Sequence, residues 1–307
     1  MTPVAVVYKF SALESYSPRQ IRRHRELNPD LGKRLESAHD EHSQSLEKLR
    51  ALLTRLGVEA DFHERDGLSQ SLDNYRLVIS IGGDGTFINA SHFTEKALLI
   101  GVNSSPANSV GHYCRFHLSS AAAERAFQHL LEALLRGKKS PVREQELIRI
   151  QVHVHDRPVG FPVLNDVLFC EENPAATSRY TLRYRGGSHH QKSSGIWIST
   201  PTGSTAAYSS AGGQEFKKRE LRFLVRELYS DSARSVQHRP AASRAASLYP
   251  RGKRLLKGNI RSGEKLHIVS SMMHGALYLD GSHHKVPVAL GEHVRIAVHP
   301  HALRAIY

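Results

Sequence analysis

The residues of this chain that are most suited to chemistry lie at positions 78–86, which read VISIGGDGT. An apolar run ends at Gly82 and Gly83, and Gly85 follows the acid Asp84. Such a loop lets a backbone approach a ligand and, where it opens a helix, turns free N–H groups toward an anion. A carboxylate in its centre indicates chemistry on a hydroxyl beside a phosphate, with Asp84 as base or metal partner. The alternative is an ordinary turn in which Asp84 is a helix N-cap.

Three further segments place polar groups beside apolar runs. Residues 198–206 read ISTPTGSTA, residues 101–104 read GVNS, and the pair Asn165 and Asp166 stands between apolar residues. An Asn side chain donates and accepts together, which suits the edge of an adenine, and an acid suits a ribose hydroxyl. Asn-Asp is also a good turn pair, but polar groups within an apolar strand need partners. These segments therefore indicate a nucleotide site.

Taken in order, the four segments resemble the NAD kinase family, whose pattern is GGDGT, GxN, an Asn–acid pair and TPTGSTA. The resemblance covers residues 76–213 and continues more loosely at 279–281 and 291–294. It implies an enzyme that transfers the γ-phosphoryl of ATP, or of another donor such as polyphosphate, to the 2′-hydroxyl of the adenosine ribose of NAD. Two alternatives remain: a lipid kinase of the diacylglycerol kinase type, which shares GGDGT, and a non-catalytic dinucleotide sensor.

The resemblance also assigns roles to single residues. Asp84 matches the catalytic acid, so we expect it to be the general base. We expect a divalent cation such as Mg²⁺ to arrive with the triphosphate, with no dedicated protein ligands, and the chain to form a dimer or tetramer. The other matched positions are expected to bind the dinucleotide or the phosphoryl donor: Gly82, Gly83, Gly85, Thr86, His92, Asn103, Asn165, Asp166, Lys192, Ser194, Thr202, Gly203, Ser204, Thr205, Ala206, Tyr208 and Ser210.

The sequence departs from the family pattern at several positions, among them the following. Asp166 is one methylene shorter than the usual Glu, and Tyr208 stands one residue late, which turns it by about 100° on a helix. Ser194 takes the position of an acid, so the negative charge near the substrate is reduced and Lys192 can meet a phosphate. The run KSSG at residues 192–195 also resembles the mitochondrial NAD kinases of animals.

Composition narrows the class of protein further. The chain has 307 residues, enough for two domains, and a net charge of +13, which favours anionic partners. Aromatic residues do not interleave with the basic ones, so nucleic acid is not expected. No long apolar run predicts a membrane span, and the N-terminus reads as a strand rather than a secretory signal. Two isolated cysteines, Cys114 and Cys170, read as free thiols, so we expect a cytoplasmic protein.

Local patterns predict two domains of different class. Up to about residue 136, strands alternate with helices, which predicts a Rossmann-like α/β domain with a mostly parallel sheet. After residue 140, short alternating runs predict an all-β domain. We place the domains at 1–139 and 140–298, with 299–307 packing back on the first. Residues 11–40 read as a partly helical insert before a helix that begins near 43, and the basic segment 214–263 reads as helix-like at 218–229.

Overall fold

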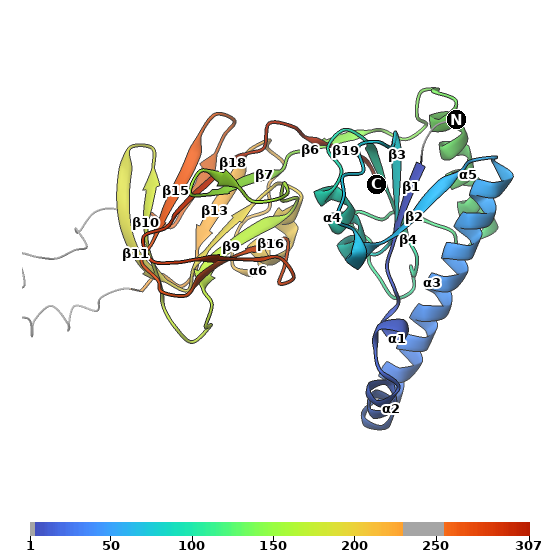
Figure 1. Cartoon of the computed structure of the whole chain (residues 1–307), viewed down its shortest axis with the longest axis horizontal. Helices are drawn as coiled ribbons and strands as arrows, with labels where there is room; N and C mark the ends of the chain where they lie inside the picture. The colour runs from blue at the N-terminus through green and yellow to red at the C-terminus, as the bar shows by residue number, and fades with distance from the viewer. Residues whose placement is uncertain (1–3, 230–254) are drawn as a thin grey trace, which may run out of the picture. The chain divides into compact units, whose positions relative to one another are not determined.

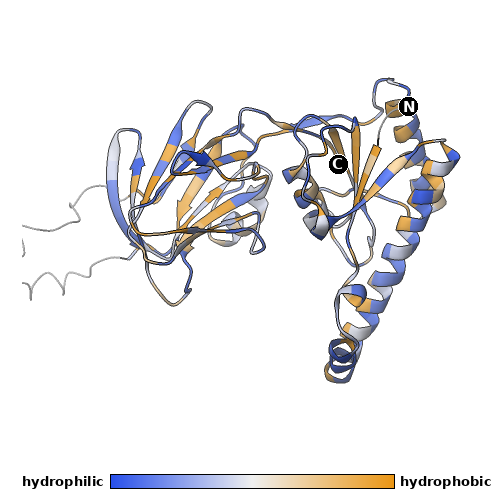
Figure 2. Ribbon diagram, viewed as in Figure 1, coloured by the Kyte–Doolittle hydropathy of each residue, from blue (hydrophilic) through white to orange (hydrophobic). Residues whose placement is uncertain are grey.

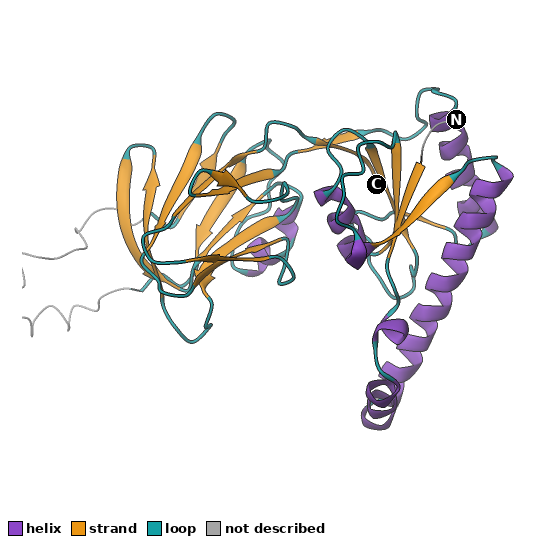
Figure 3. Cartoon of the chain, viewed as in Figure 1, coloured by secondary structure: helices purple, strands orange, loops and turns teal. Residues whose placement is uncertain are grey.

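The computed structural model describes residues 4–229 and 255–307, which form two compact units. The first unit comprises Met1–Leu147 and Ala302–Tyr307, and the second comprises Ile148–His301. The first is an α/β unit and the second contains mainly strands, which confirms the expected fold class (Figure 1, Figure 3).

A mostly parallel sheet forms the centre of the first unit. Its strands run in the order β2-β1-β3-β4-β19-β6, and β5 also pairs with β4. All pairs are parallel except β19 with β6. The bounds are β1 Val4–Tyr8, β2 Ala60–Glu64, β3 Leu77–Gly82, β4 Leu98–Asn103, β5 Phe116–His117, β6 Gln145–Leu147 and β19 Leu303–Ile306.

Helices cover both faces of this sheet. Leucines of α3 and α5, such as Leu52 and Leu130, share one buried cluster with Ile79 of β3, whereas α4 packs on the other face (Figure 1). Helices α3, α4 and α5 thus bury apolar residues against the strands, as expected for a doubly covered sheet, whereas α1 and α2 have no buried residue. The helices are α1 Ala12–Ser15, α2 Pro18–Leu27, α3 Pro29–Arg55, α4 Asp84–His92 and α5 Ala121–Leu135, with a short 3₁₀ turn at Arg65–Gly67.

Helix α3 corrects the expectation for the segment at residues 11–40. It is one helix of 27 residues, begun by Asn28, whose side chain accepts a hydrogen bond from Leu31 N, and by Pro29 at its first position. The prediction of a start near residue 43 was wrong because the periodic leucines occupy only the second half. The first half is mostly exposed, and Figure 2 shows the helix as mainly hydrophilic.

The second unit is a sandwich of two antiparallel six-stranded sheets. One has the order β11-β10-β15-β18-β7-β8 and the other β14-β13-β12-β9-β16-β17. Apolar residues of both, such as Leu266 and Phe169, fill one core between them. The bounds are β7 Ile150–Val154, β8 Arg157–Pro158, β9 Asp166–Glu171, β10 Ser178–Tyr184, β11 Gly187–Ser193, β12 Ile196–Ser199, β13 Leu221–Val225, β14 Lys257–Ile260, β15 Lys265–Ser270, β16 Gly275–Leu279, β17 Lys285–Val288 and β18 His293–Val298; a 3₁₀ turn at Gly203–Thr205 and α6 Ala207–Ser210 follow β12.

Two sequence predictions about the second unit need correction. The boundary falls after Leu147 rather than at 139, because β6 pairs with β19 in the first sheet, and the return segment begins at Ala302 rather than 299. The helix-like stretch at 218–229 contains strand β13, whose alternate residues are buried with the period of a strand. Residues 230–254 of the basic segment lie outside the described residues. Within the described part, no helix is long and apolar enough to cross a membrane.

Candidate functional site

The glycine loop lies at the carboxyl end of β3, where α/β sheets commonly bind ligands. β3 is buried throughout and ends at Gly82, Gly83 is the N-cap of α4, and Asp84 is its first residue. β4 ends beside it, since Gly82 pairs with Asn103. The Oγ1 atom of Thr86 is buried and has no hydrogen-bond partner among the described residues.

The carboxylate of Asp84 is held by two backbone donors from a distant loop. Its Oδ2 accepts from His112 N at 3.0 Å and its Oδ1 from Tyr113 N at 2.7 Å. The alternative interpretation of Asp84 as an N-cap is wrong, because Gly83 takes that position and Asp84 bonds outside its own helix. Each carboxylate oxygen keeps a second lone pair, so the group is oriented but still able to accept a proton.

An aromatic cluster supports this loop. The ring of Tyr113 stacks on Phe87 of α4 with centroids 5.0 Å apart, and Tyr307 packs against Tyr113 at 5.5 Å. His112 also contacts Tyr113 edge-on. Sequence reasoning missed His112 and Tyr113, because the groups with which they hold Asp84 are backbone N–H donors.

Asn103 shapes the loop that follows β4 rather than leaving its amide open. Its Oδ1 accepts from Ser105 N at 3.1 Å, and its Nδ2 donates to Ser109 O at 3.0 Å. His92 lies at the far end of α4, about 12 Å along the helix axis from Asp84. It is buried, so it is not on the helix surface, and the structure does not bring it to the glycine loop.

In the second unit, the structure brings two of the predicted motifs together. β9 and β12 are antiparallel neighbours in which Asp166 pairs with Ser199. Thr200 N donates to Asn165 O at 2.9 Å. A Cβ added to Gly203 would lie 2.2 Å from the same carbonyl oxygen, so only glycine allows this approach.

Asp280 is the residue that organises this cluster. Its carboxylate accepts from the backbone N–H groups of Leu164 at 2.8 Å, Asn165 at 2.6 Å and Asp166 at 3.2 Å. It follows β16 in a left-handed conformation with φ of 51°, ahead of Gly281. The sequence marked this turn only as a loose match, because nothing local shows which backbone the carboxylate reaches.

Asp166 lies beside that carboxylate and is itself buried. Burial raises the pKa of Asp166 to about 7, and the charge of Asp280 adds to the shift. Because Asp166 titrates near neutrality, small changes in its surroundings decide whether it donates or accepts a hydrogen bond.

This shift predicts how stability depends on pH. The folded state binds the proton of Asp166 more tightly than the unfolded state, so stability falls as the pH rises from about 4 to about 7. The loss from this group is no more than roughly 4 kcal/mol. Asp166→Asn removes this titration. Between pH 5 and pH 8 the free energy of unfolding of the wild type, measured by denaturant unfolding, should therefore fall relative to that of the variant. A difference independent of pH would contradict the assignment.

The other predicted residues that follow β12 differ in their surroundings. Thr202 Oγ1 lies 3.0 Å from Thr200 Oγ1, and Ser204 Oγ donates to Pro201 O at 2.6 Å, so both hydroxyls hold the turn. Tyr208 is buried with its ring 6.1 Å from Phe216. Three of the predicted residues are exposed at the end of the turn or beyond it: Thr205, Ala206 and Ser210.

Lys192 and Ser194 lie at the other end of β12 from this cluster. Lys192 Nζ stands over the ring of Tyr229 at 4.2 Å, and Ser194 N donates to Arg226 O. Ser194 comes before the first residue of β12, and Asp166 pairs with the last residue of that strand. Ser194 and Asp166 are therefore about 16 Å apart along the strand. The structure therefore does not bring these two residues to the Asn165 cluster within the second unit.

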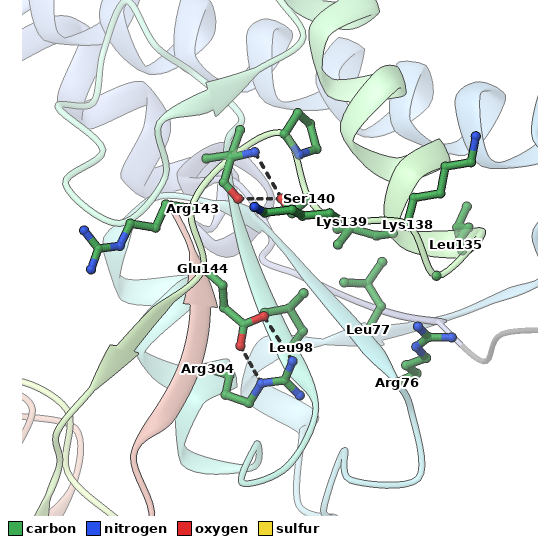
Figure 4. Close-up of a pocket in the computed structure, with 14 residues that line it drawn as sticks. Arg76, Leu77, Leu98, Leu135, Lys138, Lys139, Ser140, Arg143, Glu144 and Arg304 are labelled. Carbon is green, nitrogen blue, oxygen red and sulfur yellow. Dashed lines mark hydrogen bonds and ion pairs between the residues drawn. The ribbon is translucent and has the colours of Figure 1, made fainter.

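A pocket of about 690 Å³ in the first unit lies away from the glycine loop, at the amino ends of β3 and β4. Leu77 and Leu98 line it, and Arg304 forms an ion pair with Glu144 there (Figure 4). Lys138 and Arg143 extend away from it in Figure 4, so its positive charges do not converge.

Comparisons with known proteins decide the family. No family model matches the chain. A probable NADH kinase of Oryza sativa subsp. japonica is 31% identical over 303 residues, covering 91% of this chain and 85% of the relative. The chain belongs to the NAD(H) kinase family. The NADH kinase of Arabidopsis thaliana is 28% identical, covering 88% of this chain and 84% of its own length.

Solved structures of the NAD(H) kinase family share the fold. An NAD kinase from Archaeoglobus fulgidus in complex with ATP matches with a TM-score of 0.61 at 17% identity, covering 100% of this chain and 94% of that chain. Yeast NADH kinase complexed with NADH matches with a TM-score of 0.64 at 13% identity, covering 99% and 83%. The protein is therefore a kinase with the two-domain fold of this family.

Proposed function

We propose that this NAD(H) kinase transfers the γ-phosphoryl of ATP to the 2′-hydroxyl of the adenosine ribose of NAD or NADH. The observation that carries the proposal is the carboxylate of Asp84 at the tip of the glycine loop, oriented by the N–H groups of His112 and Tyr113. A base held in a fixed direction needs little reorganisation when it takes a proton from a hydroxyl.

In this mechanism each motif has its own role. Asp84 accepts the proton of the 2′-hydroxyl, and the backbone at Gly83 and Gly85 binds phosphate oxygens. Asn165 and Asp166 recognise the adenosine, since an amide matches a base edge and an acid matches a ribose hydroxyl. Orientation of the hydroxyl toward the phosphorus is the main catalytic contribution in phosphoryl transfer.

A divalent cation fits this scheme as a partner of the triphosphate. Among the described residues, no three His, Cys, Asp or Glu side chains come together to hold a metal ion. Mg²⁺ bound to ATP would neutralise charge on the phosphates.

Both redox forms of the dinucleotide belong in the test, because the rice and Arabidopsis relatives are named NADH kinases. Purified protein is given ATP and Mg²⁺ with NAD or NADH, and NADP(H) is detected with an NADP-specific dehydrogenase. Polyphosphate replaces ATP in a parallel assay. Product with either dinucleotide supports the proposal. No product from any combination, with dinucleotide binding intact by calorimetry, would favour the sensor alternative. Phosphorylation of diacylglycerol in vesicles, with none of NAD(H), would favour the lipid kinase.

The oligomeric state and the cytoplasmic location remain predictions.

Gly85 provides a separate test of the phosphate cradle. It is exposed in the first turn of α4, and an added Cβ would meet nothing within 4 Å, so the chain itself does not require glycine there. Gly85→Ala should raise the free energy of unfolding by about 0.5–1 kcal/mol, because alanine is the better helix residue. It should nevertheless raise the KM for ATP, since the methyl group occupies the space proposed for a phosphate.

Gly160→Ala is the matched control, because its added Cβ would also meet nothing within 4 Å and Gly160 lies outside the motifs. We expect an unchanged KM for ATP in that variant. If Gly85→Ala also leaves this KM unchanged, the phosphates do not approach the loop at this position.

A further inference from the structure

Helix α3 makes buried polar contacts with the loop that follows β4. His42 Nδ1 lies 2.8 Å from Ser104 Oγ, and Ser45 Oγ donates to Ser104 O at 2.9 Å. Ser105 Oγ donates to Glu41 Oε2 at 2.7 Å. Glu41, His42 and Ser45 lie within about one turn on one face of the helix, so together they hold this loop.

The hydrogen bonds of His42 define its protonation. Nε2 lies 2.8 Å from the carbonyl oxygen of Lys9, which can only accept, so Nε2 carries the hydrogen. Nδ1 then accepts from the hydroxyl of Ser104 in the neutral ring. The side chain is buried, with 3% exposure, so both ring nitrogens depend on these partners.

From this loop, contacts continue to Asp84. Ser105 N donates to Asn103 Oδ1, and Asn103 Nδ2 donates to Ser109 O. The chain then reaches the two backbone N–H groups that hold the Asp84 carboxylate. A displacement of the loop therefore passes through the hydrogen bonds of Asn103 and then along the backbone from Ser109 to the two N–H groups that hold the proposed base.

We propose that His42 is a positioning residue of the kinase site, which acts through Ser104 to hold the loop after β4 and so the direction of the Asp84 carboxylate. The proposal rests on the proposed function of Asp84. It gives a catalytic role to α3, a helix whose first half reads in the sequence as part of an insert. His42 itself touches neither substrate nor base.

Protonation of His42 reverses its hydrogen bond to Ser104. The charged ring would donate from Nδ1 to the Ser104 hydroxyl, which must then turn its own hydrogen to another acceptor. Burial lowers the pKa of His42 below its ordinary value of 6.5; the backbone bond to Lys9 and the charge of Glu14 oppose this shift, and the charges of Lys9 and His39 add to it. We therefore expect kcat to decline only below about pH 6.5, as the ring becomes charged.

The test compares three variants of the full chain. His42→Gln should lower kcat/KM for NAD about 10-fold to 100-fold, chiefly through kcat, and its decline of kcat at low pH should be shallower than that of the wild type, because only the contribution of His42 is removed. Ser45→Ala removes the second contact to Ser104 with a smaller change in volume, and should lower kcat in the same direction. His39→Gln is the matched control on the same helix, because His39 Nδ1 contacts Ser11 Oγ instead. Its kcat above pH 7 should match that of the wild type, and its decline at low pH should remain, moved slightly upward because the charge of His39 no longer lowers the pKa of His42.

Wild-type kcat in His42→Gln, or a lowered kcat that keeps the wild-type decline at low pH, would overturn the proposal. Hydrogen exchange of residues 103–113 separates this failure from failure of the proposed function. Exchange should be faster in His42→Gln and Ser45→Ala than in His39→Gln, even if the wild type forms no NADP. Equal exchange rates in all three variants would show that α3 does not hold the loop.

Discussion

Asp84→Asn should lower kcat for NADP formation by about a thousandfold, while the dissociation constant for NAD stays close to that of the wild type. The amide cannot take the proton of the 2′-hydroxyl, but it has nearly the same shape as the carboxylate, so contacts of the bound ground state remain. Turnover is measured by the coupled assay and binding by calorimetry. The combination distinguishes a lost base from a lost binding site.

The same substitution has a structural cost that needs a control. The introduced amide would place an NH₂ group against one of the two backbone donors, His112 N or Tyr113 N, and one hydrogen bond would be lost. Asp73 is a matched carboxylate in the same unit, because its Oδ1 accepts from Glu95 N at 2.8 Å and Lys96 N at 2.7 Å. Asp73→Asn removes the same charge, but its carbonyl oxygen can keep both bonds, so it should lose less stability than Asp84→Asn and keep kcat. If Asp84→Asn retains more than about a tenth of the wild-type kcat, another group is the base.

Sequence reasoning found the parts of the site that depend on local pattern. The glycine loop at Asp84 can be recognised from the adjacent residues alone, because an apolar strand, a run of glycines and the start of a helix follow one another directly in the sequence. Asn165 and Gly203 also belong to recognisable segments, but their contact depends on strands β9 and β12 pairing with a particular register. Register is set by packing of the whole sandwich, so it was not available from either segment.

The groups that orient these motifs left little or no sequence signal. His112 and Tyr113 act through backbone N–H groups, which every residue but proline possesses. His42 belongs to a stretch of α3 whose apolar periodicity begins only after it, and its partner Ser104 is far along the chain. Asp280 contacts Asn165, which stands 115 residues earlier in the chain. Long-range polar contacts of this kind follow from the fold and cannot be read before it is known.

Asp280 carries the second large prediction. Asp280→Ala leaves the N–H groups of Leu164, Asn165 and Asp166 without their acceptor. Leu164 and Asp166 are buried, and an unsatisfied buried donor costs about 1–3 kcal/mol, so we expect the free energy of unfolding to fall by about 3 kcal/mol or more. The released strand end should also weaken dinucleotide binding, because Asn165 and Asp166 lose their fixed direction.

Asp280→Asn grades this effect. The carbonyl oxygen of the introduced Asn can take the place of Oδ1, which accepts from both Asn165 N and Asp166 N. The variant then loses only the bond to Leu164 N. Stability and dinucleotide affinity should therefore fall less than in Asp280→Ala. Removing the charge also removes one cause of the raised pKa of Asp166, so the pH dependence of stability between pH 5 and pH 8 should become shallower. Denaturant unfolding and calorimetry of the two variants check this order. Equal affinity for NAD in the wild type and both variants would mean that the Asn165–Asp166 pair does not contact the dinucleotide, and would leave Asp280 with a role in stability alone.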